Sequence, residues 1–510
     1  MTVATSAVTP RAGVHAFLGQ LLDAGTFTAW DTAPGVDPEA DADYRAALAR
    51  AMERSGVDEA VVTGEGLVDG HQVAVIVSEF GFLGGSIGRA AADRIVAAVD
   101  EAQRRGMPLV AATASGGTRM QEGTPAFLQM LRITAAIERF KAHRLPYLAY
   151  LRHPTTGGVF ASWASRAHFT AGEPGALIGF LGPKVYEGLT GHEFPRGIQT
   201  AEHLFTCGTL DAVVDLAGFR RLVSDFLGIL RDEGGERGVG PDAPSRETHS
   251  PAMPGSAVPS APPEGQEPAA DDDAIAFGEA RHLGAWQAVL ESRSPDRPGL
   301  TEFLAEGFDR LVPLHGTGRG QASAAIAVVL ASLAGRPVVV IGQDRAAQRA
   351  GHPLDAAALA QARRGMRLAA GLDLPVVTVI DTPGAELSQR AEEHAIAGGI
   401  ADCIAEMLQL PVPTVAVLLG EGTGGGALAL AAGRRMVAAQ HAWLAPLPPE
   451  GASVIVHGGP SRAADVAERQ RITAWELAVS GAVDEIVEEA PDARGFCRRL
   501  AEAVVRQLDR

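Results

Sequence analysis

The sequence predicts an α/β protein in which one folding unit occurs twice. Apolar runs of strand length are followed repeatedly by glycine turns and helical patterns, and the second half of the chain repeats the first. A proline-rich segment without aromatic residues separates the two halves. The length of 510 residues also suits two units of roughly 200 to 250 residues better than one ordinary hydrophobic core.

The clearest glycine turn is Gly116-Gly117, between a buried strand at residues 108–113 and a helical pattern at residues 127–133. Such an arrangement leaves backbone N–H groups free at the start of the helix, where they can hold a developing negative charge. A second turn in this half, Gly157-Gly158, follows a strand predicted at residues 146–151. One glycine pair is weak evidence in a chain with 60 glycines, so the repeat decides the interpretation.

Four sequence segments of the first half recur in the same order in the second half. They are a strand start, two strand-to-turn segments and a short helix with its following turn, and matched residues lie 265 to 273 residues apart. The matched positions include Gly117 with Gly384, and Gly157 with Gly424. We interpret the repeat as a tandem duplication of one α/β unit built from ββα-type steps.

The segment of residues 233–273 marks the boundary between the halves. It holds eight of the 32 prolines and no Phe, Trp or Tyr, so it cannot bury enough apolar surface to offset its ordering entropy. We therefore predict one domain over residues 1–232, a disordered linker over residues 233–273 and a second domain over residues 274–510.

Composition excludes several classes of function. The net charge of −17 argues against nucleic acid or an anionic membrane as the main partner. The three cysteines form no CxxC pair, so we predict neither a disulfide framework nor a metal site. No signal peptide is visible and the apolar runs are too short to span a membrane, which predicts a cytoplasmic protein without membrane contact.

The side chains of common catalytic triads and metalloproteases are missing, because the chain has no GxSxG and no HExxH motif. Asp381 and Glu421 near the turns are possible acids or bases, although solvated loop carboxylates are the simpler interpretation. Arg119 and Lys184 could meet a phosphate or carboxylate, or form surface salt bridges of little consequence. The pattern favours stabilisation of an oxyanion by backbone amides, with packing of strands against helices as the alternative role of the glycines.

Several motifs then resemble one family closely. FGFLGGSIG (residues 80–88), ASGGTRMQE (114–122), PTTGGVFAS (154–162) and ALIGFLGP (176–183) resemble the β subunit of bacterial acetyl-CoA carboxylase carboxyltransferase. DTPGA (381–385), GEGTGGGALAL (420–430) and PEGASVI (449–455) resemble its α subunit. The chain thus looks like a fused β–α carboxyltransferase of a biotin-dependent acyl-CoA carboxylase.

The resemblance implies two ClpP/crotonase-like domains and an enzyme that moves CO₂ from N-carboxybiotin to the α-carbon of an acyl-CoA, giving malonyl-CoA or a homologue. By this resemblance, amides at Gly116 and Gly117 hold the thioester enolate. Those at Gly425, Gly426 and Ala427 hold the ureido oxygen of biotin. Further residues are expected to bind substrate: Gly84, Gly85, Ser86, Arg119, Gly157, Gly158 and Gly384.

The same resemblance implies partners. No Met-Lys dipeptide of a biotinylation motif is present, so a separate biotin carboxyl carrier protein and a biotin carboxylase are expected. An active site shared between chains predicts a homo-oligomer, a dimer or a trimer of dimers, in fatty acid or polyketide biosynthesis. The residues after DTPGA, 386–390, depart from the family pattern. Two alternatives stay open: a biotin-independent decarboxylase of a malonyl-type thioester, and a non-catalytic scaffold.

Overall fold

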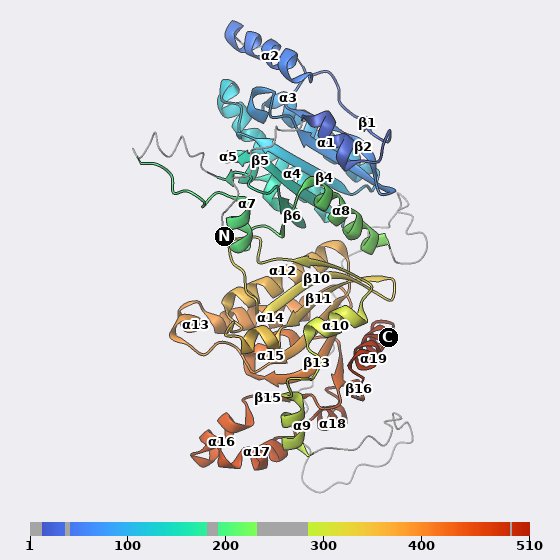
Figure 1. Cartoon of the computed structure of the whole chain (residues 1–510), viewed down its shortest axis with the longest axis vertical. Coiled ribbons are helices and arrows are strands. Elements are labelled where there is room, and N and C mark those ends of the chain that lie inside the picture. Colours follow the sequence, from blue (N-terminus) through green and yellow to red (C-terminus); the bar gives the residue numbers. More distant parts are fainter. Residues whose placement is uncertain (1–12, 36–40, 181–191, 232–283, 490–491) are drawn as a thin grey trace, which may run out of the picture.

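Each half of the chain forms one mixed β-sheet covered by helices, as a computed structural model shows (Figure 1). The structure describes residues 13–35, 41–180, 192–231, 284–489 and 492–510. The linker predicted at residues 233–273 and Lys184 lie outside these ranges. In Figure 1 the N-terminal half, in blue and green, stands above the C-terminal half, in yellow to red.

The first sheet has eight strands in the order β1-β2-β3-β4-β5-β6-β8, with β7 paired to β5. The pairs β1–β2 and β2–β3 are antiparallel, and the other pairs are parallel. The strands are β1 (Thr28–Ala29), β2 (Val61–Val68), β3 (His71–Ser78), β4 (Leu109–Ser115), β5 (Tyr147–Thr156), β6 (Phe169–Gly172), β7 (Ile178–Gly179) and β8 (Ala212–Val213). The strands predicted at residues 108–113 and 146–151 are confirmed as β4 and β5.

Helices and short 3₁₀ turns connect and cover these strands. They are α1 (Val14–Leu21), α2 (Ala42–Ser55), η1 (Leu83–Gly85), α3 (Arg89–Arg104), η2 (Met120–Glu122), α4 (Gly123–Ala142), α5 (Gly157–Phe160), η3 (Trp163–Arg166), α7 (Ala201–Thr206) and α8 (Leu216–Arg231). Helix α3 buries Ile95 and Val99 on one face, because apolar residues four apart lie on the same side of a helix.

The second sheet repeats the topology of the first, with the order β16-β14-β13-β12-β11-β10-β9 and β15 paired to β13. Its strands are β9 (Arg310–Leu314), β10 (Ile326–Leu333), β11 (Arg336–Gln343), β12 (Val376–Thr382), β13 (Thr414–Thr423), β14 (Arg435–Ala439), β15 (Trp443–Ala445) and β16 (Glu485–Val487). Even the irregularities match, since the register shift between Thr113 and Ser115 in β4 recurs between Ile380 and Thr382 in β12. The predicted duplication is confirmed.

The helices of the second half are α9 (Ala285–Ser292), α10 (Leu300–Gly307), α11 (Arg345–Arg349), α12 (Ala356–Leu372), α13 (Gln389–Glu393), α14 (Ile396–Gln409), α15 (Gly424–Ala431), α16 (Pro449–His457), η4 (Pro460–Arg462), α17 (Ala463–Gln470), α18 (Ala474–Val479) and α19 (Ala493–Leu508). No helix in the described ranges is long and apolar enough to cross a membrane.

The two halves share one hydrophobic cluster. It contains Phe219 and Phe226 of α8, from the first half, together with Val312 and Leu314 of β9, from the second. Figure 1 shows α8 on the side of the upper half that faces the lower half. Asp211 adds a polar link, because it accepts hydrogen bonds from the N–H of His315 (3.0 Å) and from Arg364 (2.8 Å). The halves are therefore two copies of one fold that pack tightly together.

Candidate active site: paired glycine turns in each half

The first glycine turn directly follows Ser115, the last residue of β4, and the side chain of that serine accepts a hydrogen bond from the turn. The N–H of Gly117 donates to Ser115 Oγ at 3.0 Å, and the N–H of Gly116 donates to the carbonyl of Gly84 at 2.9 Å. Gly117 has a φ of +106°, which a side chain would strain. The two amides predicted to hold the enolate thus already have acceptors within the chain.

The turn after β5 lies directly against this first turn. A Cβ atom built on Gly117 would lie 3.3 Å from the nitrogen of Gly158, and one on Gly157 would lie 3.3 Å from the carbonyl oxygen of Gly116. The two turns of the first half therefore meet. Only glycine permits this approach, so both turns depend on the absence of side chains.

Two N–H groups at this junction are without an acceptor. Among the described residues, the N–H of Thr118 and the N–H of Gly158 form no hydrogen bond. The pairing of Ile87 with Thr118 shows where the Thr118 N–H points. The N–H of Ile87 donates to the carbonyl of Gly117, and the carbonyl of Ile87 accepts from the N–H of Arg119, both at 2.9 Å. In a parallel pairing of this kind, the N–H of the residue between them, Thr118, faces away from Ile87. A Cβ on Gly158 would lie 3.2 Å from Thr118 Oγ1, so the two residues adjoin.

The loop of residues 83–88 forms the third wall of this site. A Cβ on Gly85 would lie 1.9 Å from the carbonyl oxygen of Ala114, so the loop backbone rests on the end of β4. Gly84 and Gly85 both have positive φ, +67° and +64°. The predicted substrate-binding residues Gly84, Gly85 and Ser86 are therefore brought to the first turn, where they shape the backbone around it.

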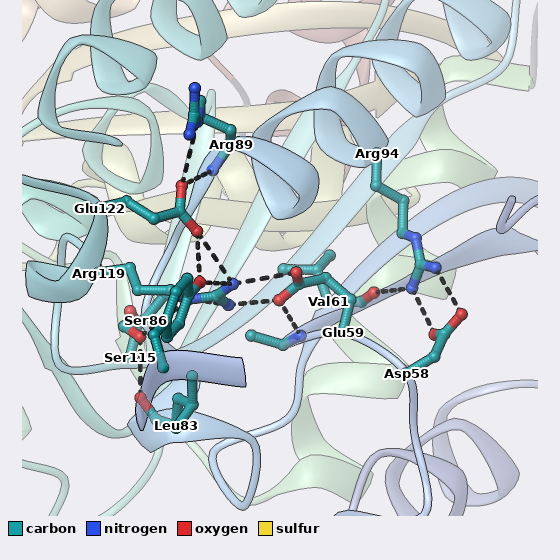
Figure 2. Close-up of polar contacts among 12 residues, drawn as sticks. Asp58, Glu59, Val61, Leu83, Ser86, Arg89, Arg94, Ser115, Arg119 and Glu122 are labelled. Atoms are coloured by element: carbon teal, nitrogen blue, oxygen red, sulfur yellow. Dashed lines mark hydrogen bonds and ion pairs between the residues drawn. The ribbon is translucent and has the colours of Figure 1, made fainter. Parts of the chain in front are cut away.

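Arg119 is held by carboxylates inside the protein (Figure 2). Its guanidinium is 1 % exposed, pairs with Glu59 through both terminal nitrogens, and donates to the carbonyl of Ser86 at 2.8 Å. Burial lowers the pKa of this guanidinium, but the Glu59 carboxylate more than offsets the effect and raises the pKa above its ordinary value. Glu122 completes the cluster, accepting from Tyr44 Oη and from the N–H of Arg89, both at 2.6 Å.

This arrangement gives Arg119 a role that the sequence did not indicate. The side chain was expected to meet a phosphate or carboxylate of the substrate. Its partners are instead Glu59, at the entrance to β2, and the loop that carries Ser86 (Figure 2). Arg119 therefore ties the loop of residues 83–88 to the first glycine turn, and a direct contact with substrate stays a prediction.

The second half repeats this construction 267 residues later. The N–H of Gly384 donates to Thr382 Oγ1 at 3.1 Å, as Gly117 does to Ser115. Gly384 has a φ of +128° and Gly424 a φ of +60°, close to those of Gly117 and Gly157. The bridge between Leu354 and Ala385 matches the bridge between Ile87 and Thr118.

The predicted biotin-side residues start helix α15. A Cβ on Gly426 would lie 2.8 Å from the nitrogen of Ala385, so the turn after β13 meets the turn after β12. Within the described ranges, the N–H groups of Ala385, Gly425 and Gly426 form no hydrogen bond. Ala427 is buried in the first turn of α15. The first position of the turn is Pro383, which has no N–H at all.

Pro383 occupies the place that Gly116 has in the first half. Since the duplicated turn dispenses with an N–H there, the shared construction does not require a donor at this position. The amides common to both halves and free of partners are those of Thr118 and Gly158, and of Ala385 and Gly425. Sequence reasoning missed Thr118 and Ala385. The sequence did contain a signal for these two residues. Thr118 directly follows Gly117 and Ala385 directly follows Gly384, and the two positions lie 267 residues apart.

Asp381 and Glu421 lie inside the protein, and their interpretation as solvated loop carboxylates is wrong. Asp381 is fully buried and accepts from the N–H of Glu421 at 3.1 Å. Burial raises the pKa of the Asp381 carboxyl to about 6, although Arg345 and Arg297 oppose the shift. Glu421 is 4 % exposed and accepts from Arg293 at 2.9 Å. These carboxylates brace β12 and β13 behind the second pair of turns.

Residues 386–390 lie just before and at the start of α13. Glu386 is anchored by its N–H to the carbonyl of Leu354 at 3.0 Å, and Ser388 Oγ donates to the Glu386 carboxylate at 2.6 Å. Leu387 between them is 97 % exposed. The described part of the chain contains no group of three or more His, Cys, Asp or Glu residues that could hold a metal ion.

Comparisons with known proteins agree with this architecture. A carboxyl transferase domain matches residues 22–224, and an acetyl co-enzyme A carboxylase carboxyltransferase-like domain matches residues 275–510. A probable biotin-dependent acyl-coenzyme A carboxylase beta3 subunit of Mycobacterium tuberculosis is 48% identical over 96% of this chain and 92% of its own length. The chain belongs to the carboxyltransferases of biotin-dependent acyl-CoA carboxylases.

Other relatives extend the match to fused subunits. The acetyl-coenzyme A carboxylase carboxyl transferase subunits beta/alpha of Salinispora arenicola are 39% identical over 98% of this chain and 88% of their own length. The solved structure of transcarboxylase 12S, a hexamer with hydrolysed methylmalonyl-coenzyme A bound, has a TM-score of 0.71 at 19% identity and covers 98% of this chain and 89% of its own. The predicted tandem crotonase-like fold and the carboxyltransferase family are confirmed.

Proposed function

We propose that this carboxyltransferase moves CO₂ from N-carboxybiotin on a carrier protein to the α-carbon of acetyl-CoA or a similar short acyl-CoA, giving malonyl-CoA or a homologue. The proposal rests on one observation above all. In each half, two glycine turns meet and leave backbone N–H groups that have no acceptor among the described residues. The two halves thereby supply two equivalent places for an oxygen that gains negative charge.

The first-half junction is assigned to the thioester. Its oxygen accepts hydrogen bonds from Thr118 and Gly158, and Gly116 and Gly117 shape the turn that presents them. One such donor is typically worth about 3 kcal/mol of barrier lowering, because it is aimed in advance at the developing charge. Gly84, Gly85 and Ser86 bound the site next to the turn, and Arg119 holds that loop in place.

The second-half junction is assigned to biotin. The ureido oxygen accepts from the amides of Ala385, Gly425 and Gly426, with Ala427 behind them and Gly384 at the turn. Carboxybiotin, when presented by its carrier, supplies the carboxyl group. The free amides fit such an acceptor, because an oxygen that gains negative charge is stabilised by hydrogen-bond donors already aimed at it. The exposed segment around Leu387 borders the approach to this junction.

The proposed reaction defines the partners. A biotin carboxyl carrier protein and a biotin carboxylase supply the carboxylated cofactor, and the chain works as a homo-oligomer, a dimer or a trimer of dimers. The hexamer of transcarboxylase 12S supports the larger assembly. A cytoplasmic location and a role in fatty acid or polyketide biosynthesis complete the proposal.

The test is the reverse reaction, with the purified chain, malonyl-CoA or methylmalonyl-CoA, and free biotin. Loss of the malonyl group that requires biotin supports the proposal, and the preferred thioester identifies the acyl group. Loss at the same rate without biotin would replace it with the decarboxylase. No loss with either thioester, even with the biotinylated carrier added, would favour a scaffold.

A further inference from the structure

A cavity of about 260 Å³ lies where the two halves meet. Its walls come from the ends of α4 and α5, the segment before β6, the loops before β8 and β10, and α12. Figure 1 shows α12 and β10 on the side of the lower half that faces the upper half. The cavity thus belongs to both copies of the duplicated fold.

The charged side chains of this cavity are all cationic. Among the residues that the structure describes, its walls include no Asp or Glu, in a chain of net charge −17, but they include five cations: Lys141, Arg166, Arg319, Arg364 and Arg367. A concentration of one sign of charge in a concave surface raises the local concentration of ligands of the opposite sign.

Carboxylates outside the cavity neutralise only part of this charge. Arg166 pairs with Glu138 at 2.7 Å, and Arg364 pairs with Asp211 at 2.8 Å. Arg367 reaches Glu406 only at 3.4 Å, and Glu406 is closer to Arg363 at 2.7 Å.

Arg319 has no such partner. In the described part of the chain its guanidinium forms neither a hydrogen bond nor an ion pair. Its loop is held by the backbone, since Arg319 N–H donates to Thr317 Oγ1 at 3.1 Å and Gly318 N–H donates to Gly208 O at 2.8 Å. A fixed loop with a free guanidinium is suited to a planar anionic group, which arginine binds with two parallel hydrogen bonds.

His168 adds a neutral donor to the cavity wall. Its Nδ1 accepts from the N–H of Tyr147 at 3.1 Å, which assigns the ring proton to Nε2. Burial lowers the pKa of His168 to about 3, so the ring is neutral at physiological pH. Nε2 lies toward Gly371, which also lines the cavity.

The cavity reaches Phe160, at the end of the helix that starts at Gly157, as well as His168, which lies beside the start of β5. His168 N–H donates to the carbonyl of Tyr147, the first residue of β5, whereas the turn at Gly157 follows the last residue, Thr156.

We propose that this junction cavity binds the phosphate group of a small anionic metabolite, and that the bound anion bridges the two halves. The cationic and donor groups come from both sides: Lys141, Arg166 and His168 from the first half, and Arg319, Arg364 and Arg367 from the second. A ligand that binds only the folded arrangement stabilises it by mass action. The site is independent of the proposed carboxyl transfer.

Titration calorimetry of the full chain with pyrophosphate, at fixed ionic strength, tests the site. The variant Arg319→Ala/Arg367→Gln is expected to bind pyrophosphate at least tenfold more weakly and to lose the rise in melting temperature that the anion gives the parent. Arg498→Ala is the control, because Arg498 is an exposed arginine outside the cavity and pairs with Glu306. It should bind within twofold of the parent.

Two kinds of result would overturn the proposal. The first is an absence of pyrophosphate binding by the parent chain at millimolar concentration, or equal binding by the parent and the double variant. The second is displacement of pyrophosphate by malonyl-CoA, which would make the cavity the nucleotide end of the acyl-CoA site. Binding of pyrophosphate or ADP that malonyl-CoA leaves unchanged supports a separate site for a free phosphate-bearing metabolite.

Discussion

The first-half junction can be blocked with one methyl group. Gly117→Ala places its Cβ 3.3 Å from the nitrogen of Gly158, on the space that the thioester oxygen is proposed to occupy. Loss of one oxyanion donor typically lowers kcat by about 10²- to 10³-fold, or roughly 3 to 4 kcal/mol. We therefore expect turnover of malonyl-CoA in the biotin-dependent reverse reaction to fall by at least about 10²-fold.

The same substitution also strains the backbone, and the strain needs its own control. A side chain at the φ of +106° of Gly117 costs on the order of 1–3 kcal/mol of stability. Gly106→Ala provides the match, since Gly106 has a φ of +64° and nothing within 4 Å of the added methyl group. Denaturant unfolding of both variants measures the cost of strain. A Gly117→Ala protein that unfolds like Gly106→Ala and keeps turnover within twofold of the parent would refute the reasoning.

Three further predictions concern buried charges. Arg119→Met leaves Glu59 buried without its partner, so the free energy of unfolding should fall by about 3–5 kcal/mol in urea titration; a change below about 1 kcal/mol would contradict the positioning role. Because the folded pKa of Asp381 is raised from 3.8 to about 6, its stabilising contribution is present below pH 4 and is lost as pH rises through 6. The free energy of unfolding should fall by on the order of 3 kcal/mol between pH 4 and pH 7, and Asp381→Asn should abolish that fall. Curves of stability against pH that run parallel for the variant and the parent would contradict this prediction. Asp211→Ala removes the acceptor shared by His315 and Arg364 and should lower the melting temperature, whereas an unchanged melting temperature would show that the apolar cluster alone joins the halves.

Much of the fold was predictable because duplication leaves a periodic signal. The pairs Gly117–Gly384 and Gly157–Gly424 need the same positive φ, so selection for one backbone shape keeps glycine at both copies. The strands β3, β4 and β5 were predictable for a similar reason, since a parallel strand buried on both faces reads as a continuous apolar run.

The contacts between distant segments were not predictable from the sequence. Arg119 finds its carboxylate sixty residues away, at Glu59, and no local pattern specifies that pairing. The capture of the Gly116 N–H by Gly84 depends on how the loop of residues 83–88 folds onto β4. Which amides stay free is therefore a property of tertiary structure, although the position of the turn is a property of the sequence.

The sequence also did not predict that the two halves share a hydrophobic core. The two predicted domains read as separate units because each has its own strands and turns. Helix α8 carries Phe219 and Phe226, and its apolar face packs in one cluster with residues of both the first and the second sheet. An amphipathic helix shows that it buries a face, but its sequence does not identify the surface against which the face packs.

The central claim is that the two junctions divide the work, with the acyl-CoA at the first and biotin at the second. The most direct measurement is the affinity of malonyl-CoA for Gly117→Ala and for Gly426→Ala, by calorimetry, beside the KM for free biotin in the reverse reaction. Gly426→Ala places its methyl group 2.8 Å from the nitrogen of Ala385, at the second junction.

We predict that Gly117→Ala weakens malonyl-CoA binding by at least tenfold. Gly426→Ala should leave that binding within twofold of the parent and raise the KM for biotin. Equal weakening of malonyl-CoA binding by the two variants would contradict the division of labour.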